Sequence, residues 1–255
     1  MSLNRTRGTN VPALISFRKI KALYGKNMKN IFYNAFIITA PVAILILAYM
    51  FGMFVIPDDA PPEVIKELLN MILNMTVNMN IIMCGVMIMA VLIAEEKEKN
   101  TLNVLITSTV SGMDFLTANV LTTATVTIIC NIAVYFIIGA YNIVPFGSFM
   151  LITSLGSVAA ITFGATIGLL SKNQIVASTI VAPIFLIILI PVFLRGSFFV
   201  DNVLYYFFTE QIGIAISELI NERSLSAARY VIITANFAVF AVLFVLCYRK
   251  RGLSS

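Results

Sequence analysis

Long apolar blocks separated by short polar segments dominate this chain. Six of these blocks reach the length of about 20 residues that an α-helix needs to cross roughly 30 Å of hydrocarbon. They fall at residues 31–56, 71–94, 115–141, 148–170, 175–194 and 230–248. A helix satisfies its own backbone hydrogen bonds, which lipid cannot do. The pattern therefore predicts an all-α, polytopic membrane protein with six transmembrane helices.

The blocks divide the chain into a basic stretch at 1–30, a membrane domain at 31–248 and a basic tail at 249–255. Within the first stretch, apolar residues recur at three- and four-residue steps over 11–29. They are Leu14, Phe17, Ile20, Leu23, Tyr24 and Met28. This spacing predicts an amphipathic helix that lies in the cytoplasmic membrane surface, or that serves only as a basic anchor fixing the topology.

Two connecting segments differ in character. Residues 57–70 are acidic and contain prolines, so we expect a solvated turn there. Residues 195–229 mix polar and apolar positions, with Glu210, Gln211 and Glu218 among apolar neighbours. That segment is too polar to span and too apolar for a free loop. It predicts one or two short helices between spans 5 and 6 that lie on the outer leaflet or dip into it, shielded by protein where the backbone is not helical.

The charge distribution orients the spans. Charged residues make up only 11% of the chain, against roughly 25% in a typical soluble domain. With both termini inside, only Lys66, Arg195, Arg223 and Arg229 of the 17 Lys and Arg lie outside, and the other thirteen lie inside. Cytoplasmic segments carry such an excess, so both termini are expected in the cytoplasm. This orientation explains the net charge of +5 without a nucleic-acid partner.

The sequence offers little for catalysis. It contains no His, and Cys84, Cys130 and Cys247 fall inside predicted spans without the spacing of a metal site. Its Ser and Thr residues have no evident base partner, so we assign no catalytic or metal-binding residue. No GxxxxGK[ST] phosphate loop occurs, and this chain is therefore not expected to bind ATP itself. If energy drives the protein, another polypeptide supplies it.

The segment between spans 2 and 3 is the most informative one. A charged run comes first and apolar positions follow it. These residues are Glu95, Glu96, Lys97, Glu98, Lys99, Thr101, Leu102, Leu105 and Ile106. The pattern alone indicates either a charged helical start followed by a short amphipathic helix at the cytoplasmic surface, or a solvated loop.

This stretch resembles the signature of type-2 permeases of the ATP-binding-cassette transporter superfamily, a run close to E-[RK]-E-[RK]-G-T-L-E-x-L-L-x-[TS]-P-[VL]-S. The positions that fit are Glu96, Lys97, Glu98, Lys99, Thr101, Leu102, Leu105, Ile106, Ser108, Val110 and Ser111. The positions that depart are Asn100 for Gly, Asn103 for Glu, Thr109 for Pro and Asn119 for Lys. The family's layout of a basic amphipathic helix, six spans and dipping helices before the last span also resembles this chain over nearly its whole length.

The resemblance implies a function and partners. The segment at 95–106 would be the coupling helix that sits in a groove of a separate ATPase subunit, present in two copies. ATP and Mg would be bound by that ATPase, and this chain would bind no cofactor directly. A second permease subunit, expected to be an identical copy, would complete the membrane unit.

Permeases of this form resemble exporters in the bacterial plasma membrane. The expected substrate is amphipathic or hydrophobic, such as a peptide toxin, a bacteriocin or an antibiotic. An alternative is a non-transporting immunity or peptide-sensing subunit of the same fold. A passive channel is less favoured, because the chain has no charged pore rings.

Two stripes run along span 2. Met75, Met79 and Met83 recur every four residues, and Asn74 and Asn78 run beside them. Met surfaces adapt to varied apolar partners, and intramembrane Asn prefers a protein interior or a wet cavity. One hypothesis is that both stripes line a translocation path. The alternative is that they pack span 2 against its neighbours or against a second copy.

Overall fold

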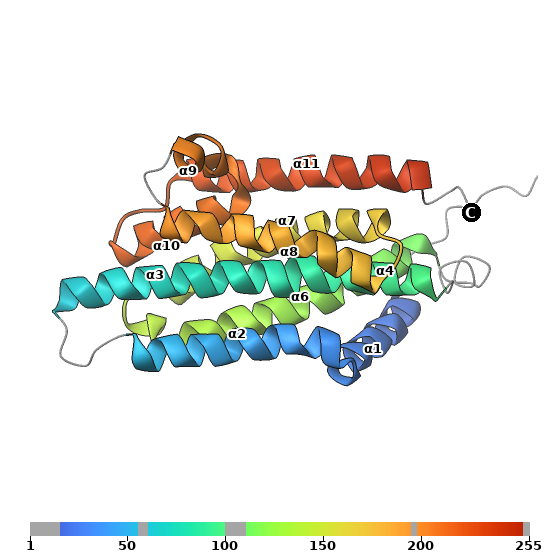
Figure 1. Ribbon diagram of the computed structural model, residues 1–255, viewed down its shortest axis with the longest axis horizontal. Helices are drawn as coiled ribbons and strands as arrows, with labels where there is room; N and C mark the ends of the chain where they lie inside the picture. The colour runs from blue at the N-terminus through green and yellow to red at the C-terminus, as the bar shows by residue number, and fades with distance from the viewer. Residues whose placement is uncertain (1–15, 56–60, 100–110, 195–197, 252–255) are drawn as a thin grey trace, which may run out of the picture.

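The structure is a computed structural model that describes residues 16–55, 61–99, 111–194 and 198–251 (Figure 1). Every regular element in this part of the chain is a helix. The long elements are α1 (Phe17–Tyr33), α2 (Ala35–Phe54), α3 (Pro62–Asn80), the π-helical segment η1 (Ile81–Met87), α4 (Ile88–Glu98), α6 (Gly112–Ile137), α7 (Phe146–Leu170), α8 (Gln174–Phe193), α10 (Phe208–Ile220) and α11 (Ala227–Arg251). The short elements are η2 (Ala140–Asn142), α9 (Phe198–Asn202) and η3 (Leu204–Tyr206).

Six of the described helices are long and apolar enough to cross a membrane. They are Ala35–Phe54, Pro62–Glu98, Gly112–Ile137, Phe146–Leu170, Gln174–Pro191 and Ala227–Lys250. The second span is one continuous rod made of α3, η1 and α4, and the spans lie side by side along the long axis of the molecule (Figure 1). This arrangement confirms the predicted fold class, because each predicted apolar block forms one span.

Two predicted boundaries are wrong. Residues 31–33 belong to α1 and not to the first span, because Asn34 caps α2 by accepting a hydrogen bond from the Phe36 N–H at 3.1 Å. Residues 62–70 are helical and not a solvated turn. Pro62 stands in the first turn of α3 and Glu63 lies near its positive end, and both residues favour a helix start.

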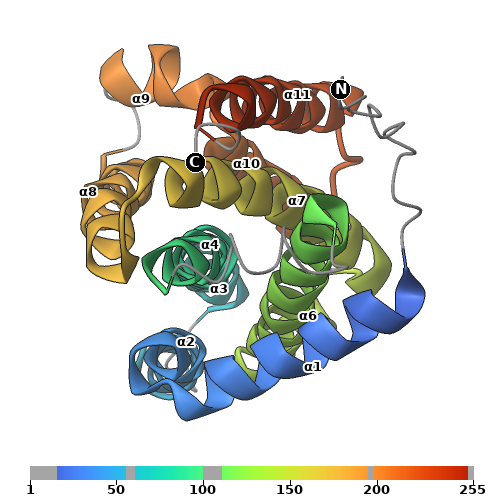
Figure 2. The ribbon, with the colours of Figure 1, turned by 90° about the vertical axis from the view of Figure 1, so that its right-hand side faces the viewer.

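The second span is the centre of the bundle. The protein itself buries 89% of its apolar window, against 22% for Gln174–Pro191 and 11% for Ala227–Lys250. Figure 2 shows α3 and α4 surrounded by α2, α6, α7 and α8. The peripheral spans expose apolar side chains such as Leu186 and Val242. Lipid is the solvent that such surfaces require.

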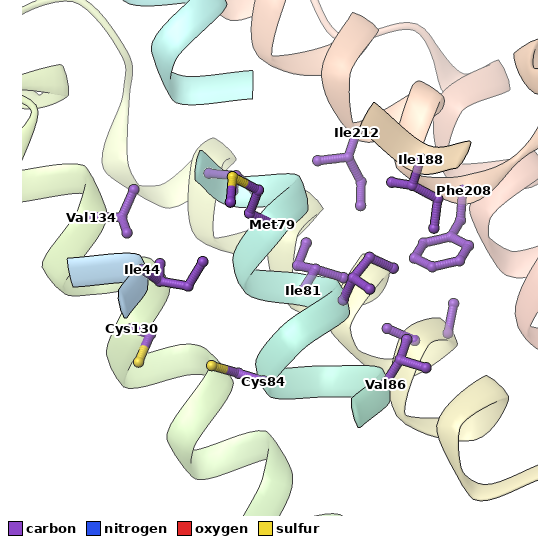
Figure 3. Packing of buried hydrophobic residues seen from close by; sticks show 14 of the residues in the cluster. Ile44, Met79, Ile81, Cys84, Val86, Cys130, Val134, Ile188, Phe208 and Ile212 are labelled. Atoms are coloured by element: carbon purple, nitrogen blue, oxygen red, sulfur yellow. The ribbon is translucent and has the colours of Figure 1, made fainter. Parts of the chain in front are cut away.

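The π-helical segment η1 packs on two sides of the core. Figure 3 shows Cys84 lying toward Cys130 of α6, and Ile81 lying toward Ile212 of α10 and Ile188 of α8. All five side chains are buried. A π-helical turn inserts one residue into an α-helix and shifts the faces that follow it. Here it lies in the middle of the central span.

Helix α7 approaches this region through two glycines. A Cβ atom on Gly164 would lie 2.3 Å from the carbonyl oxygen of Val86, and one on Gly168 would lie 2.8 Å from that of Ala90. Only a residue without a side chain permits two helix backbones to come so close. The sequence of α7 therefore fixes its packing distance from the second span.

The segment between spans 5 and 6 forms the short helices that were predicted. Helix α10 packs against α3, α7 and α11. Its residues Phe208, Ile212 and Ile216 have no exposed surface. Protein thus encloses this polar-apolar helix within the bundle, which satisfies the requirement for shielding.

Helix α1 runs obliquely across one end of the bundle, against α6 and α2 (Figures 1 and 2). We call this the α1 end. The buried positions of α1 are Ile20, Asn27 and Ile31, whereas Phe17 of the predicted apolar stripe is 81% exposed. Residues 11–15 of the predicted helix, including Leu14, lie outside the described residues. The α1 end also holds the last turns of α4, α7 and α11 and the first turns of α6 and α8 (Figure 1).

Candidate functional site

The predicted coupling residues lie at the α1 end. Glu95, Glu96, Lys97 and Glu98 form the last turn of α4, and Lys99 follows it. The other predicted residues, Thr101, Leu102 and Leu105, lie outside the described part of the chain. The charged run therefore stands directly before residues 100–110, which connect α4 to α6.

Glu95 and Glu96 are buried against α1. Their side chains are 5% and 9% exposed. Lys26 Nζ contacts Glu96 Oε1 at 2.5 Å, and Asn30 Nδ2 donates to Glu95 Oε2 at 2.7 Å. Lys99 pairs with the other oxygen of Glu95, which raises the pKa of Lys99 above its ordinary value. Burying a carboxylate is costly unless it is paired, and these partners supply the pairing.

Lys97 and Glu98 bind the ends of two other spans. Lys97 Nζ donates to the carbonyl oxygens of Leu169 at 2.7 Å and Ser171 at 2.6 Å, at the C-terminus of α7. Glu98 Oε2 accepts from the backbone N–H of Gln174 at 3.3 Å, at the N-terminus of α8. A cation at a helix C-terminus and an anion at a helix N-terminus both match the helix dipole.

The sequence reasoning assigned these charges to an ATPase contact and missed their partners within the chain. Those partners lie on α1 for Glu95 and Glu96, and at the ends of α7 and α8 for Lys97 and Glu98, all far away in the sequence. A signal was present at Asn27, which is a polar residue on the buried side of α1. Its Nδ2 donates to Asn119 Oδ1 at 2.8 Å, so α1 is also bonded to α6.

The structure places the Asn stripe of span 2 against α10. Asn74 and Asn78 are only 2% and 5% exposed. Asn74 donates to Asn70 Oδ1 at 2.7 Å and to Ser217 Oγ at 3.4 Å. A Cβ on Gly213 of α10 would lie 2.8 Å from Asn74 Oδ1. In this conformation the stripe packs inside the chain.

The Met stripe does not share that face. Met79 is 7% exposed, and Met75 and Met83 are partly buried at the edge of the core. Met75 and Met79 each follow an Asn of the stripe by one residue, which places them about 100° further around α3. The structure therefore does not bring the two stripes onto one wall.

An amide pair that the sequence reasoning did not single out lies between spans 2 and 3. Asn80 Nδ2 donates to Asn131 Oδ1 at 2.8 Å and to the carbonyl oxygen of Thr127 at 3.0 Å. Both Asn residues have no exposed surface. Among the described residues, Asn80 Oδ1 and Asn131 Nδ2 have no hydrogen-bond partner. Asn80 falls off the four-residue stripe, so its spacing gave no signal.

A second polar network joins α10 to α11 at the opposite end of the bundle. Arg229 contacts Glu218 at 3.0 Å, and their side chains are 15% and 16% exposed. Its guanidinium also donates to Tyr205 Oη and to Gln211 Oε1, each at 3.0 Å. This network fixes α10 against the last span.

A central span enclosed by its neighbours, with an oblique helix at one end and an inserted helix at the other, is the arrangement of a multi-pass membrane protein. The model of the ABC-2 family transporter protein matches residues 70–248, from α3 to α11. The chain belongs to this family and is its membrane component, and membership implies an ABC ATPase partner. A search of curated proteins gave no match.

Proposed function

We propose that this chain is the membrane subunit of an ATP-driven exporter in the bacterial plasma membrane, with both termini in the cytoplasm. The family match over residues 70–248 carries this proposal. Two copies of an ABC ATPase bind ATP and Mg and supply the energy. A second, identical permease completes the pathway. The substrate is amphipathic or hydrophobic, such as a peptide toxin, a bacteriocin or an antibiotic.

We propose that residues 95–106 carry the coupling contact with the ATPase. Charges in the first part of this segment bind α1, α7 and α8, as described above. The direct contact is therefore expected to begin at Lys99, whose side chain is 59% exposed, and to include Thr101, Leu102 and Leu105. Glu95, Glu96, Lys97 and Glu98 form the base from which this contact extends.

We propose that the translocation path runs along the second span. Met75 and Met83 offer an adaptable apolar surface at the edge of the core, beside the buried Met79. Asn74 and Asn78 join the path when α10 moves away from α3, because α10 covers them in the present conformation. A path with one apolar and one amide-bearing side suits an amphipathic substrate.

Reconstitution of the permease with its ATPase tests this function. In inside-out vesicles, we expect ATP-dependent accumulation of a labelled candidate peptide or antibiotic, and faster ATP turnover when the candidate is present. The control is the same complex with the phosphate-loop Lys of the ATPase replaced. Binding of the candidate without accumulation would instead indicate an immunity or sensing subunit.

A further inference from the structure

We infer that Lys26 and Asn30 of α1 are positioning residues that clamp α1 onto Glu96 and Glu95, so that movement of the coupling segment is passed to α1. The inference rests on the proposed function, because it assumes that an ATPase moves that segment. It assigns a role to two residues of α1 that lie outside the coupling motif. It also assigns an intrachain role to the two acidic residues at the start of that motif.

The burial of the acidic pair supports this role. A solvated charge run would leave its carboxylates exposed, but Glu95 and Glu96 are only 5% and 9% exposed. Both oxygens of Glu95 are occupied, one by Asn30 and the other by Lys99. A buried carboxylate that loses its partner is strongly unfavourable. Separating α1 from α4 would take Lys26 away from Glu96 and Asn30 away from Glu95, so we expect the two helices to move together.

Helix α1 is bonded to both α4 and α6, so it can transmit movement between them. On one side α1 binds Glu95 and Glu96, which precede residues 100–110. On the other side it binds α6, which follows them. There the Ser16 N–H donates to Asp114 Oδ1 at 2.9 Å, and Asn27 donates to Asn119. Helix α1 thus bridges both ends of the segment that is expected to contact the ATPase.

The same turn of α4 reaches the inner ends of two more spans. Lys97 binds the last carbonyl oxygens of α7, and Glu98 binds the first turn of α8. A displacement of this turn is therefore transmitted to α1, α7 and α8 together. Such a shared attachment favours a rigid-body movement over local bending.

Charge reversal tests the clamp within the complete complex. Lys26→Glu and Glu96→Lys are made singly and together in a chain whose native cysteines are replaced and whose Ala22, an exposed residue of α1, is changed to Cys. The readout is the labelling rate of this cysteine by a maleimide, with and without ATP, Mg²⁺ and orthovanadate, which trap the ATPase. The thermal midpoint Tm of each variant is measured in parallel. Lys29→Glu combined with Glu96→Lys is the matched control, because Lys29 is exposed on the same helix.

In the parent chain, trapping is expected to change the labelling rate of α1. Each single reversal should abolish that change and lower Tm while the ATPase stays bound, and the double reversal should restore both. The Lys29 control should restore neither. Three results overturn the clamp. One is failure of Lys26→Glu to rescue the Glu96→Lys variant, which is expected if Glu96 contacts the ATPase instead. Another is recovery of Tm while no variant alters the labelling response, which is expected of a purely structural pair, and the third is a parent complex that shows no response to trapping.

Failure of the proposed function is recognised separately, as a parent chain with which no ATPase associates. In that case the recovery of Tm in the double variant still decides the contact between Lys26 and Glu96. Recovery supports the Lys26–Glu96 contact on which the clamp depends, and its absence overturns the clamp.

Discussion

Replacing Gly164 by Ala tests the close packing of α7 on the central span. A Cβ at this position would lie 2.3 Å from the carbonyl oxygen of Val86 and 2.8 Å from its Cα. Both atoms belong to backbone, so no flexible side chain can yield. Ordinary van der Waals contact begins near 3.4 Å, and one of the two helices must therefore move by about 1 Å.

The expected cost is about 1–3 kcal/mol, the usual penalty for overpacking a well-packed core. Replacing a glycine inside a helix by alanine also has an opposing effect. By itself it stabilises the helix by roughly 0.5–1 kcal/mol. Gly147→Ala in the same helix provides the matched control, because a Cβ there meets nothing within 4 Å. The difference between the two variants largely isolates the overpacking cost.

Thermal unfolding in a mild detergent measures this difference. At about 2–4 °C per kcal/mol for a chain of this size, Gly164→Ala should melt roughly 2–12 °C below Gly147→Ala. Equal melting temperatures would refute the close approach of α7 to the π-helical segment. A lower melting temperature for Gly147→Ala would refute it as well.

Three further predictions concern the polar contacts and the topology. Arg229→Met should destabilise the chain by about 1.5–3 kcal/mol, because it leaves the largely buried Glu218 carboxylate without its charged partner. Adding Glu218→Gln to this variant should recover part of the loss in thermal unfolding. A double-mutant cycle that changes Asn80 and Asn131 to Leu should give a coupling energy of about 0.6 kcal/mol, and a value near zero would contradict a hydrogen bond between these two residues. A cysteine in place of Lys172, in a chain without native cysteines, should react with an impermeant maleimide from the cytoplasmic side only. Labelling from outside would contradict the predicted orientation of the spans.

The membrane fold could be predicted from the sequence because the bilayer sets the length of each apolar block. The inserted helix α10 was also predictable, since a segment carrying Glu210 and Glu218 among apolar residues suits neither lipid nor free solvent. The π-helical segment was not predictable. Residues 81–87 are uniformly apolar apart from Gly85, and such a run has the same pattern in a π-helix as in an α-helix.

The candidate site was only partly predictable. The motif located the charged run, but the α1 partners of Glu95 and Glu96 lie at separations of 65 and 70 residues, which no local pattern reports. The Asn and Met stripes of span 2 indicated an unusual surface, but they did not show which neighbouring helix each stripe faces. This depends on where α10 returns into the bundle, which is a property of the tertiary packing.

Copurification tests the central claim most directly. The tagged chain is extracted gently from its native membrane, and the proteins that remain bound are identified and quantified by mass spectrometry. The account predicts an ABC ATPase with a phosphate loop at about one copy per permease chain. Reproducible absence of any such ATPase, with the permease intact and folded, would contradict it.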